Sequence, residues 1–255
     1  GKHYLFVEKR GPSGAPVWGA PMLDTQRDLL FFGSGQNYSL PASLTSDAIF
    51  AVHTKTGEIA WVKQFTADDT FNMACTISID HPNCPSTMGP DVDFGAPPLL
   101  TQRLSGQDIL IAGQKSGDVY GINPDTGQTI WSTRFGRGGP LGGVHWGIAA
   151  NPELGLAFIP ISDVPAFPSD VPPAPGLYAI DVKDGSLRWS VEREASCQER
   201  SCWTGLSAAI TAGPNIVVAG AMDGMLEIYR ADNGEKLWSY DTKTEYDAVN
   251  GLPTK

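Results

Sequence analysis

The sequence contains no long apolar run and few basic residues. No stretch approaches the roughly 18 consecutive apolar residues that a transmembrane helix needs, so we expect no membrane span. Lys and Arg number 18 against 28 Asp and Glu, which gives a net charge of -10. Because nucleic acids and anionic lipid surfaces attract basic proteins, this acidic balance argues against both as partners. Helical periodicity is also absent along the chain.

The chain also begins without an initiator Met or a signal-peptide pattern, which predicts a mature product or a fragment. Cysteine is scarce, with 4 residues in two close pairs, Cys75 with Cys84 and Cys197 with Cys202. Neither pair has C-x-x-C spacing and no His lies at zinc-finger distance, so we expect disulfides rather than a metal site. Three pairings are possible, of which the two local ones are the simplest. Disulfides would indicate an oxidising compartment.

Glycine, proline and hydrophobic residues are plentiful. The chain of 255 residues has 29 Gly and 20 Pro, and hydrophobic residues make up 41% of it. This composition supports a real core and suits many short strands joined by turns. A single pattern recurs four times: apolar residues, a turn ending in Gly, and an alternating strand that closes on Trp. The four copies are Ala51–Trp61, Gly121–Trp131, Ala179–Trp189 and Tyr229–Trp238.

The repeats predict sheets arranged as a β-propeller. Gly in each turn tolerates the positive φ of a hairpin, and a Trp at a fixed place in each copy is expected to pack between neighbouring sheets. An apolar strand stands before each hairpin, and four-stranded sheets repeating at about 40 to 50 residues are typical of propellers. The predicted strands are Leu29–Gly33, Ile109–Gly113, Leu156–Pro160 and Ile216–Gly220.

We therefore expect an all-β fold in which residues 1–255 form a single propeller domain of about four to five blades, incomplete at both ends. Because an open half-ring would expose strand edges, the rest of the ring is expected as further sequence or as another chain. Two of the spacings between successive repeat Trp residues are longer than the repeat length. The extra residues are assigned to a loop at Cys75–Cys84 and to the Gly-rich segment Gly136–Gly147. Pro160–Pro175 is predicted to be a Pro-rich surface loop.

The stretch Gly89–Pro98 holds two carboxylates two residues apart, Asp91 and Asp93. A carboxylate that faces a pocket can act as a general base or as a metal ligand. The alternative is a solvated acidic turn before a strand, because Asp and Pro are ordinary turn residues.

The four Trp-ending hairpins resemble the tryptophan-docking motif of quinoprotein alcohol dehydrogenases, which use pyrroloquinoline quinone (PQQ). Within that family the sequence most resembles polyvinyl-alcohol dehydrogenases, and the resemblance covers essentially the whole chain. It implies an eight-bladed propeller with the cofactor on the central axis. The motifs that carry it are F-N-M-A-C at 71–75, G-P-D-V-D-F-G-A-P-P at 89–98, A-G-Q-K-S-G-D-V at 112–119, G-R-G-G-P-L-G-G-V-H-W-G at 136–147 and A-G-A-M-D-G at 219–224.

The resemblance implies roles for five side chains. Asp93 matches the catalytic aspartate, which accepts the substrate hydroxyl proton and lies against the metal, whereas Asp91 is expected in the turn beside it. Trp18 matches the aromatic floor for the flat quinone, although it could be an ordinary core Trp. Lys115 matches the cation that hydrogen-bonds the quinone oxygens. His145 and Trp146 fall where the family places a polar residue and an aromatic on the other side of the cofactor; a structural His is the alternative.

The resemblance also implies a metal site. The segment F-F-G-S-G-Q-N at 31–37 matches a metal-binding G-T-G-N, but Gln36 stands at the expected Asn and Asn37 follows it. Either amide could be the ligand. Gly95 stands where lanthanide-using relatives carry an extra Asp, which favours calcium (Ca2+). A hard divalent cation takes carboxylate and amide oxygens and would act as a Lewis acid.

Together these residues indicate a periplasmic PQQ- and Ca2+-dependent dehydrogenase that oxidises secondary alcohols, such as those of a polymer, to ketones. No C-x-x-C-H haem motif occurs, so electrons are expected to leave through a separate cytochrome c or a further domain. A non-catalytic scaffold of the outer-membrane assembly type is the main alternative, but it has no reason to keep Trp18, Asp93, Lys115 and Trp146. A second alternative is a quinoprotein that oxidises sugars or small primary alcohols.

Overall fold

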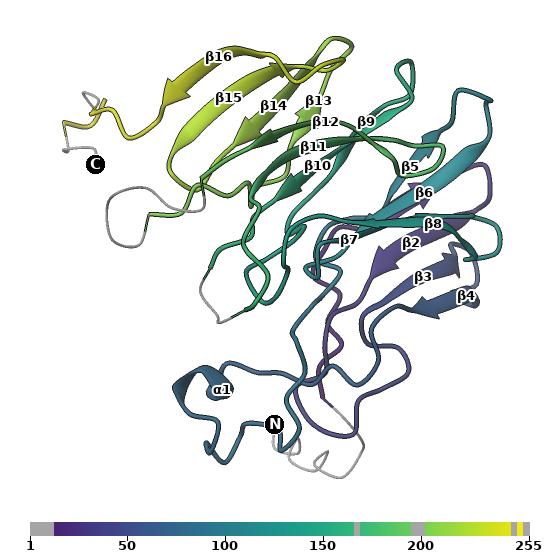
Figure 1. Cartoon of the computed structure of the whole chain (residues 1–255). Coiled ribbons are helices and arrows are strands. Elements are labelled where there is room, and N and C mark those ends of the chain that lie inside the picture. Colours follow the sequence, from purple (N-terminus) through teal and green to yellow (C-terminus); the bar gives the residue numbers. More distant parts are fainter. Residues whose placement is uncertain (1–12, 166–168, 195–201, 246–248, 252–255) are drawn as a thin grey trace.

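The computed structural model describes residues 13–165, 169–194, 202–245 and 249–251 (Figure 1). These residues form four antiparallel sheets of four strands each, with each sheet built from consecutive strands. The strands of the first two sheets are β1 (Met22–Asp24), β2 (Leu29–Gly33), β3 (Ala48–His53), β4 (Ile59–Gln64), β5 (Leu99–Gln102), β6 (Asp108–Gly113), β7 (Asp118–Ile122) and β8 (Thr129–Arg134). Those of the last two are β9 (Ala149–Asn151), β10 (Leu156–Ile161), β11 (Gly176–Asp181), β12 (Leu187–Glu192), β13 (Thr211–Ala212), β14 (Ile216–Gly220), β15 (Met225–Arg230) and β16 (Lys236–Asp241).

The sheets fan out from their first strands. The strands β1, β5, β9 and β13 contact one another in series, and three apolar clusters fill the spaces between successive sheets. Ile111 of β6, for example, is fully buried in the same cluster as Ile159 of β10 and Tyr178 of β11. This arrangement of stacked, twisted sheets confirms the all-β, partial-propeller fold predicted from the repeats.

The Trp hairpins join one sheet to the next. The indole Nε1 of Trp61 donates to the carbonyl of Pro124 at 2.9 Å, and that of Trp131 donates to the carbonyl of Val182 at 3.1 Å. Trp189 does the same to the carbonyl of Ala231 at 3.0 Å. The prediction that these indoles pack between sheets is therefore confirmed.

The fourth Trp does not dock on a following sheet among the described residues. The glycines in the hairpin turns explain how the other indoles pack. Trp238 on β16 is 46% exposed and stacks on Tyr240. At the hairpin turn of the third sheet, Gly185 has φ +74°, and a Cβ there would lie 2.6 Å from the ring of Trp131. Only Gly therefore allows both the turn and the close approach of the indole.

One boundary and one short helix differ from the sequence expectation. Pro160 lies inside β10, which continues to Ile161, so the Pro-rich loop begins after it. Proline fits there because β9 pairs only with residues 156–158, which leaves one side of Pro160 without a neighbouring strand. Residues 166–168 of that loop lie outside the described residues. A one-turn helix, α1 (Ala74–Ile77), stands in a chain that shows no helical periodicity.

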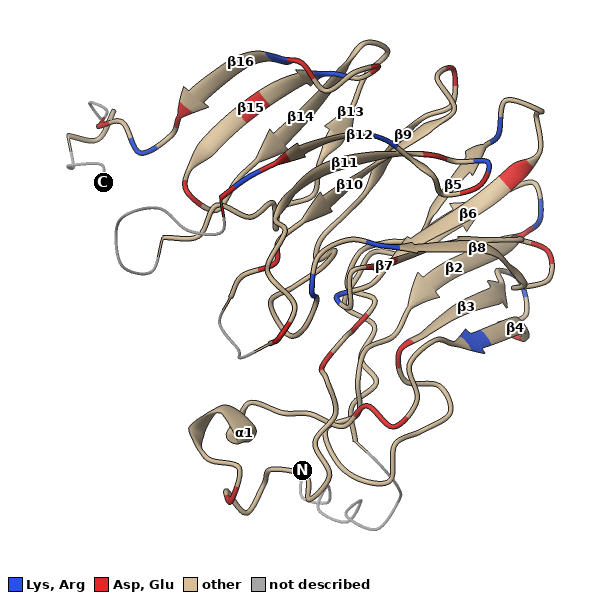
Figure 2. Ribbon diagram, in the orientation of Figure 1, with Lys and Arg blue, Asp and Glu red and all other residues tan. Residues whose placement is uncertain are grey.

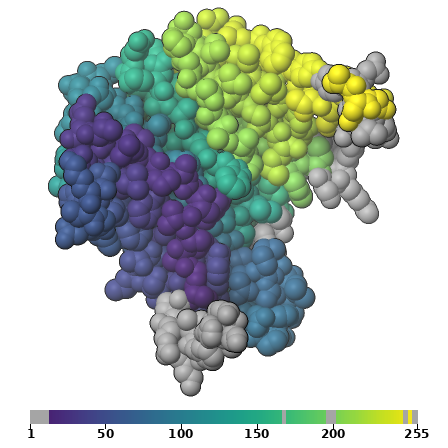
Figure 3. All heavy atoms as spheres, turned by 180° about the vertical axis from the view of Figure 1, so that it is seen from behind, coloured from purple at the N-terminus to yellow at the C-terminus, as the bar shows by residue number. Residues whose placement is uncertain are grey.

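The Cys75–Cys84 disulfide is present and closes the loop that carries α1, as predicted. Cys202 is also disulfide-bonded, whereas Cys197 lies outside the described residues. The segment around α1 projects from the sheets, as both views show (Figures 1 and 3). Within the described ranges, no helix has the length and apolar character to cross a membrane.

The antiparallel topology places the long connections at one end of the sheets. Short turns such as 25–28 and 123–128 join strands at the other end, whereas residues 34–47, 65–98 and 135–148 form long connections at this one. Acidic positions occur on these loops, between the sheets and α1 (Figure 2). Because connections at one end meet in space, this end can gather side chains that are distant in sequence.

Candidate functional site

A buried ion-pair triad lies at the end with the long connections. Lys115 stands in the tight turn between β6 and β7, and its Nζ donates to Asp93 Oδ2 at 2.9 Å and to Asp91 Oδ1 at 3.2 Å. The backbone N–H of Lys115 also donates to the carbonyl of Asp93 at 3.0 Å. The exposed fractions are 7% for Lys115, 6% for Asp91 and 4% for Asp93. The Gly89–Pro98 stretch is therefore not a solvated turn.

Neighbouring residues hold this carboxylate loop in place. Asp69 accepts the backbone N–H groups of Asp91 at 3.0 Å and Val92 at 2.8 Å. Asp91 has φ 57°, a left-handed conformation that Asp tolerates better than most residues. The backbone N–H of Gln36 donates to Asp93 Oδ1 at 2.8 Å. Both oxygens of the Asp93 carboxylate thus have fixed donors, which orients the group.

Trp18 lies beside the triad. The Nζ of Lys115 is 6.0 Å from the centroid of the Trp18 ring, at the outer limit of a cation–π contact. A Cβ at Gly95 would lie 2.1 Å from the Trp18 ring. The indole therefore lies against the backbone just after Asp93. Any side chain at position 95 would clash with the ring, so this contact by itself requires glycine there.

Four of the sequence-predicted residues line one cavity of about 230 Å³: Trp18, Lys115, His145 and Trp146. The rings of Trp18 and Trp146 meet edge to face, with centroids 4.9 Å apart and planes at 80°. Trp146 is 51% exposed and also lines an adjoining, more open cavity of about 520 Å³. Trp18 precedes β1, Lys115 lies between β6 and β7, and His145 and Trp146 lie between β8 and β9, so only the fold brings them together.

His145 is held as a neutral imidazole. Its Nδ1 lies 2.9 Å from the hydroxyl oxygen of Ser207, and its buried Nε2 has no hydrogen-bond partner among the described residues. Burial, and then the positive charge of Lys115, lower the pKa of His145 to about 4. A ligand in the cavity could therefore accept or donate a hydrogen bond at Nε2, depending on the tautomer.

The structure distinguishes the two amides that the sequence left open. The Asn37 side chain is engaged, because its Oδ1 accepts the N–H and the hydroxyl of Ser43 and its Nδ2 donates to the carbonyl of Ser13. The Oε1 atom of Gln36 is buried and has no partner within the described part of the chain. Gln36, rather than Asn37, thus offers a free oxygen beside Asp93.

Acidic groups outnumber the cation around this site. Burial, followed by repulsion from Asp69, raises the pKa of Asp47 to about 9, and neither of its carboxyl oxygens has a partner in the described ranges. Burial raises the pKa of Asp91 to about 6 although Lys115 opposes it. Burial also raises the pKa of Asp69. For Lys115, attraction to Asp93 and Asp91 outweighs burial, so its pKa is raised.

This donor set fits part of a hard-cation site. Carboxylate and amide oxygens without partners are what a Ca2+ ion takes up, and a divalent charge would relieve the repulsion among the buried acids. No group of three or more His, Cys, Asp or Glu side chains is arranged around a common point within the described residues. The described residues therefore do not form a complete coordination sphere.

Sequence reasoning missed several members of the site. Ser207 and Met222 line the cavity, and the buried Asp47 and Asp69 interact electrostatically with Asp93 and Lys115. Met222 lies in the A-G-A-M-D-G motif, which marked the segment without assigning a role. Nothing local distinguishes Ser207 or the two aspartates from ordinary loop residues.

Known proteins similar to this chain agree with the motifs. A protein-family model described as outer membrane protein assembly factor BamB matches residues 171–252. A polyvinylalcohol dehydrogenase from Pseudomonas sp is 35% identical over 246 residues, which cover 94% of this chain and 37% of the relative. A second polyvinylalcohol dehydrogenase, from Sphingopyxis sp. (strain 113P3), is 32% identical over 241 residues, covering 92% of this chain and 36% of the relative.

A solved structure shows the same fold. The quinohemoprotein alcohol dehydrogenase from Comamonas testosteroni superposes with a TM-score of 0.66 at 20% identity, over 91% of this chain and 42% of that chain. The chain spans just over a third of the length of the two polyvinylalcohol dehydrogenases. The resemblance to quinoprotein alcohol dehydrogenases, and to polyvinyl-alcohol dehydrogenases among them, is thus confirmed.

Proposed function

We propose that this chain, a relative of polyvinylalcohol dehydrogenases, contributes the cofactor side of a PQQ- and Ca2+-dependent enzyme that oxidises secondary alcohols to ketones. The observation that carries the proposal is the convergence of Trp18, Lys115, His145 and Trp146 on one cavity whose lysine is paired with the buried Asp93. A scaffold gains nothing from burying these charges, because burial of ionised groups is costly.

The cavity residues suit a flat, anionic, oxygen-rich cofactor. The Trp18 ring offers an aromatic face, Lys115 offers an ammonium group, and His145 offers an unpaired Nε2. PQQ, when bound, supplies the two-electron oxidant that no protein side chain provides. For Ca2+, Gln36 Oε1 and the Asp93 carboxylate are the proposed ligands, and the ion supplies Lewis-acid polarisation.

Asp93 is the proposed general base. It is held by the Gln36 N–H on one oxygen and by Lys115, a lining residue of the cavity, on the other, so its orientation is fixed. Oxidation of a carbinol to a ketone releases the hydroxyl proton, and a positioned carboxylate can take it. Lys115 then stabilises negative charge that develops beside it.

The proposal also covers the cellular compartment, the electron acceptor and the kind of alcohol. The Cys75–Cys84 disulfide supports an oxidising compartment, for which the periplasm is proposed. A cytochrome c, as a separate protein or as a further domain, is the proposed electron acceptor, and the printed sequence contains no C-x-x-C-H motif. The alcohol can be a small molecule or a carbinol of a polymer.

Reconstitution of the intact protein with PQQ and Ca2+ tests the proposal. We expect quinone uptake, followed by dye reduction when 2-propanol is added. Asp93→Asn should lose at least about a hundredfold in turnover, as expected for loss of a general base, while still binding quinone. Failure of the intact protein to take up quinone would contradict the enzyme assignment, and full activity of Asp93→Asn would remove Asp93 from its role.

The scaffold alternative has one observation in its favour, the family model that matches residues 171–252. That range contains Ser207 and Met222 of the cavity lining but none of the predicted cofactor residues, so it bears chiefly on the fold of the last sheets. Quinone uptake distinguishes the two functions. A substrate panel of sugars, primary alcohols and secondary alcohols separates the remaining quinoprotein classes.

A further inference from the structure

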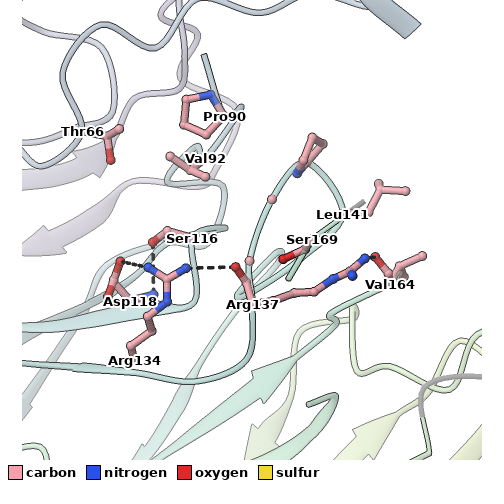
Figure 4. Close-up of a pocket in the computed structure, with 13 residues that line it drawn as sticks. Thr66, Pro90, Val92, Ser116, Asp118, Arg134, Arg137, Leu141, Val164 and Ser169 are labelled. Carbon is pink, nitrogen blue, oxygen red and sulfur yellow. Dashed lines mark hydrogen bonds and ion pairs between the residues drawn. The ribbon is translucent and has the colours of Figure 1, made fainter. Parts of the chain in front are cut away.

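A glycine-rich loop, residues 136–144, separates two cavities beside the triad. Pro140 and Leu141 of this partition loop, together with Val164, line both the candidate cofactor cavity of about 230 Å³ and a second cavity of about 420 Å³ (Figure 4). The chain runs from this loop directly into His145, which lines the smaller cavity. The position of the partition loop therefore sets the shape of the wall that a ligand in the smaller cavity meets.

Glycine gives the partition loop conformations that other residues rarely adopt. Gly136, Gly138, Gly139 and Gly143 have φ values of +69°, +73°, +115° and +57°. Turns of this kind direct backbone N–H groups into a concave nest that attracts an anion. Because glycine has the largest conformational freedom to lose, such a loop needs further contacts to hold one shape.

The anion in this nest is a side chain of the protein itself. The carboxylate of Asp163, which follows β10, is fully buried. Its Oδ2 accepts the backbone N–H groups of Arg137 and Ala174, both at 2.8 Å. Its Oδ1 accepts those of Gly138 at 3.0 Å and Gly143 at 3.4 Å. A single carboxylate thus holds both ends of the partition loop and links it to the Pro-rich loop.

The other side of the partition loop lies against the turn that carries Lys115. The N–H of Gly139 donates to the carbonyl of Lys115 at 3.1 Å. A Cβ at Gly138 would lie 2.1 Å from the carbonyl oxygen of Ser116. The loop is therefore held between this turn and Asp163, so a shift of the carboxylate changes the distance between the cavity wall and Lys115.

The residues on either side of Asp163 fix Leu141. The N–H of Val164 and the hydroxyl of Ser162 each donate to the carbonyl of Leu141 at 3.1 Å. Asp163 itself has φ 46°, a left-handed conformation that aspartate tolerates better than most residues. The same residue thus turns the chain toward Leu141 and binds the loop that contains it.

We propose that Asp163 is a positioning residue of the candidate cofactor cavity: its carboxylate holds the partition loop so that Leu141 and His145 meet the ligand at fixed places. Asp163 is not among the described residues that line this cavity, so it acts through the backbone of the loop. The inference rests on the proposed function for the identity of the ligand, a flat quinone.

Two variants disturb these contacts in different ways. Asp163→Asn keeps the shape of the side chain but replaces one acceptor oxygen by an NH2 group, which cannot accept. Gly136→Ala keeps the charge of Asp163, but its Cβ would lie 2.3 Å from Asp163 Oδ2.

Each variant has a matched control at the other end of the sheets. Asp24→Asn matches Asp163→Asn, because Asp24 is also buried and accepts the backbone N–H groups of Gln26 and Arg27. Gly106→Ala matches the glycine variant, because Gly106 has φ +81° and a Cβ there meets no atom within 4 Å.

The NMR titration of His145 in the protein without cofactor is the first measurement. Burial, and then Lys115, lower the pKa of His145 to about 4, whereas Asp93 and Asp163 raise it. If Asp163 holds the wall, both variants admit water to the imidazole, and the midpoint should rise to about 5 or above as burial is relieved. Loss of the Asp163 charge alone lowers the midpoint instead. A midpoint that fails to rise in both variants overturns the proposal.

Fluorescence titration of the intact protein with PQQ in the presence of Ca2+ is the second measurement. We expect Asp163→Asn and Gly136→Ala to weaken PQQ binding by about tenfold or more, because the partition loop must then become ordered when PQQ binds, and the two controls to leave it unchanged. Equal losses in variants and controls would overturn the role of Asp163. If the unaltered protein binds no PQQ, the proposed function fails, and the His145 midpoints still decide whether Asp163 holds the cavity wall.

Discussion

Replacing Lys115 by Met removes the only cation of the buried triad while keeping a side chain of similar length. The Nζ atom lies 2.9 Å from Asp93 and 3.2 Å from Asp91, and all three side chains are at most 8% exposed. Loss of one partner leaves two carboxylates buried without their counter-ion. Such a change costs about 3–5 kcal/mol in the free energy of unfolding, so we expect a loss of that size at pH 7.

The loss should depend on pH with a defined sign. The pKa of Asp91 is raised to about 6, so its contribution favours folding at low pH and is lost as the pH rises through about 6. Without Lys115, which lowers that pKa, the window moves to higher pH. The destabilisation caused by Lys115→Met should therefore be larger at pH 8 than at pH 5. Added Ca2+ should reduce it, since a divalent cation replaces part of the missing charge.

Urea unfolding at pH 5, 7 and 8, with Ca2+ or with EDTA, measures these effects. Lys55→Met is the control, because Lys55 pairs with Asp28 at 2.6 Å but the two side chains are 76% and 53% exposed. Such a surface pair contributes less than about 1 kcal/mol. Equal losses in the two variants, or a loss for Lys115→Met that does not change with pH, would refute the picture of an acid-rich site held by one lysine.

Three further outcomes are expected. Gln36→Ala should weaken Ca2+ binding roughly tenfold or more, the value of a contact to a charged partner; an unchanged titration would remove Gln36 from the ligand set. The His145 ring should titrate near pH 4 by NMR, because burial and Lys115 oppose its charge, and a midpoint near 6.5 would contradict this. Gly185→Ala should lower the unfolding free energy by about 1–3 kcal/mol more than Gly57→Ala, since both glycines have positive φ but only Gly185 has an indole against it; equal losses in urea would argue against indole docking.

The repeat architecture was readable in the sequence because its signals are local. A hairpin turn with Gly, such as that at Gly185, and the alternating strand closing on Trp131 depend on neighbours in the chain. The packing of Trp61, Trp131 and Trp189 between sheets follows from their fixed place in the repeat, whereas Trp238 occupies the same place and is 46% exposed. Boundaries were less readable: β10 continues past Pro160 to Ile161. Proline, which has no N–H to donate, fits there because β9 pairs only with residues 156–158, and the length of a partner strand is not a local property.

The residues of the candidate site also fall into those that sequence motifs identified and those that only the structure revealed. Its motifs singled out Trp18, Asp93, Lys115, His145 and Trp146 by resemblance, and the fold places four of them in one cavity with Asp93 paired to the lysine. The contributions of Asp91 and Asp69, which hold the lysine and the carboxylate loop, could not be predicted, because nothing in a turn sequence reports burial.

The sequence by itself determined that four hairpin-and-Trp modules form stacked sheets, and which motif residues to look for. Only the tertiary structure decided that Gln36 rather than Asn37 has a free amide oxygen, since Ser43 engages the other. It also decided that the acidic groups outnumber the single lysine around them. The charge balance and the hydrogen bonding of a buried site depend on groups from connections that are distant in sequence. Both are therefore set only when the chain folds.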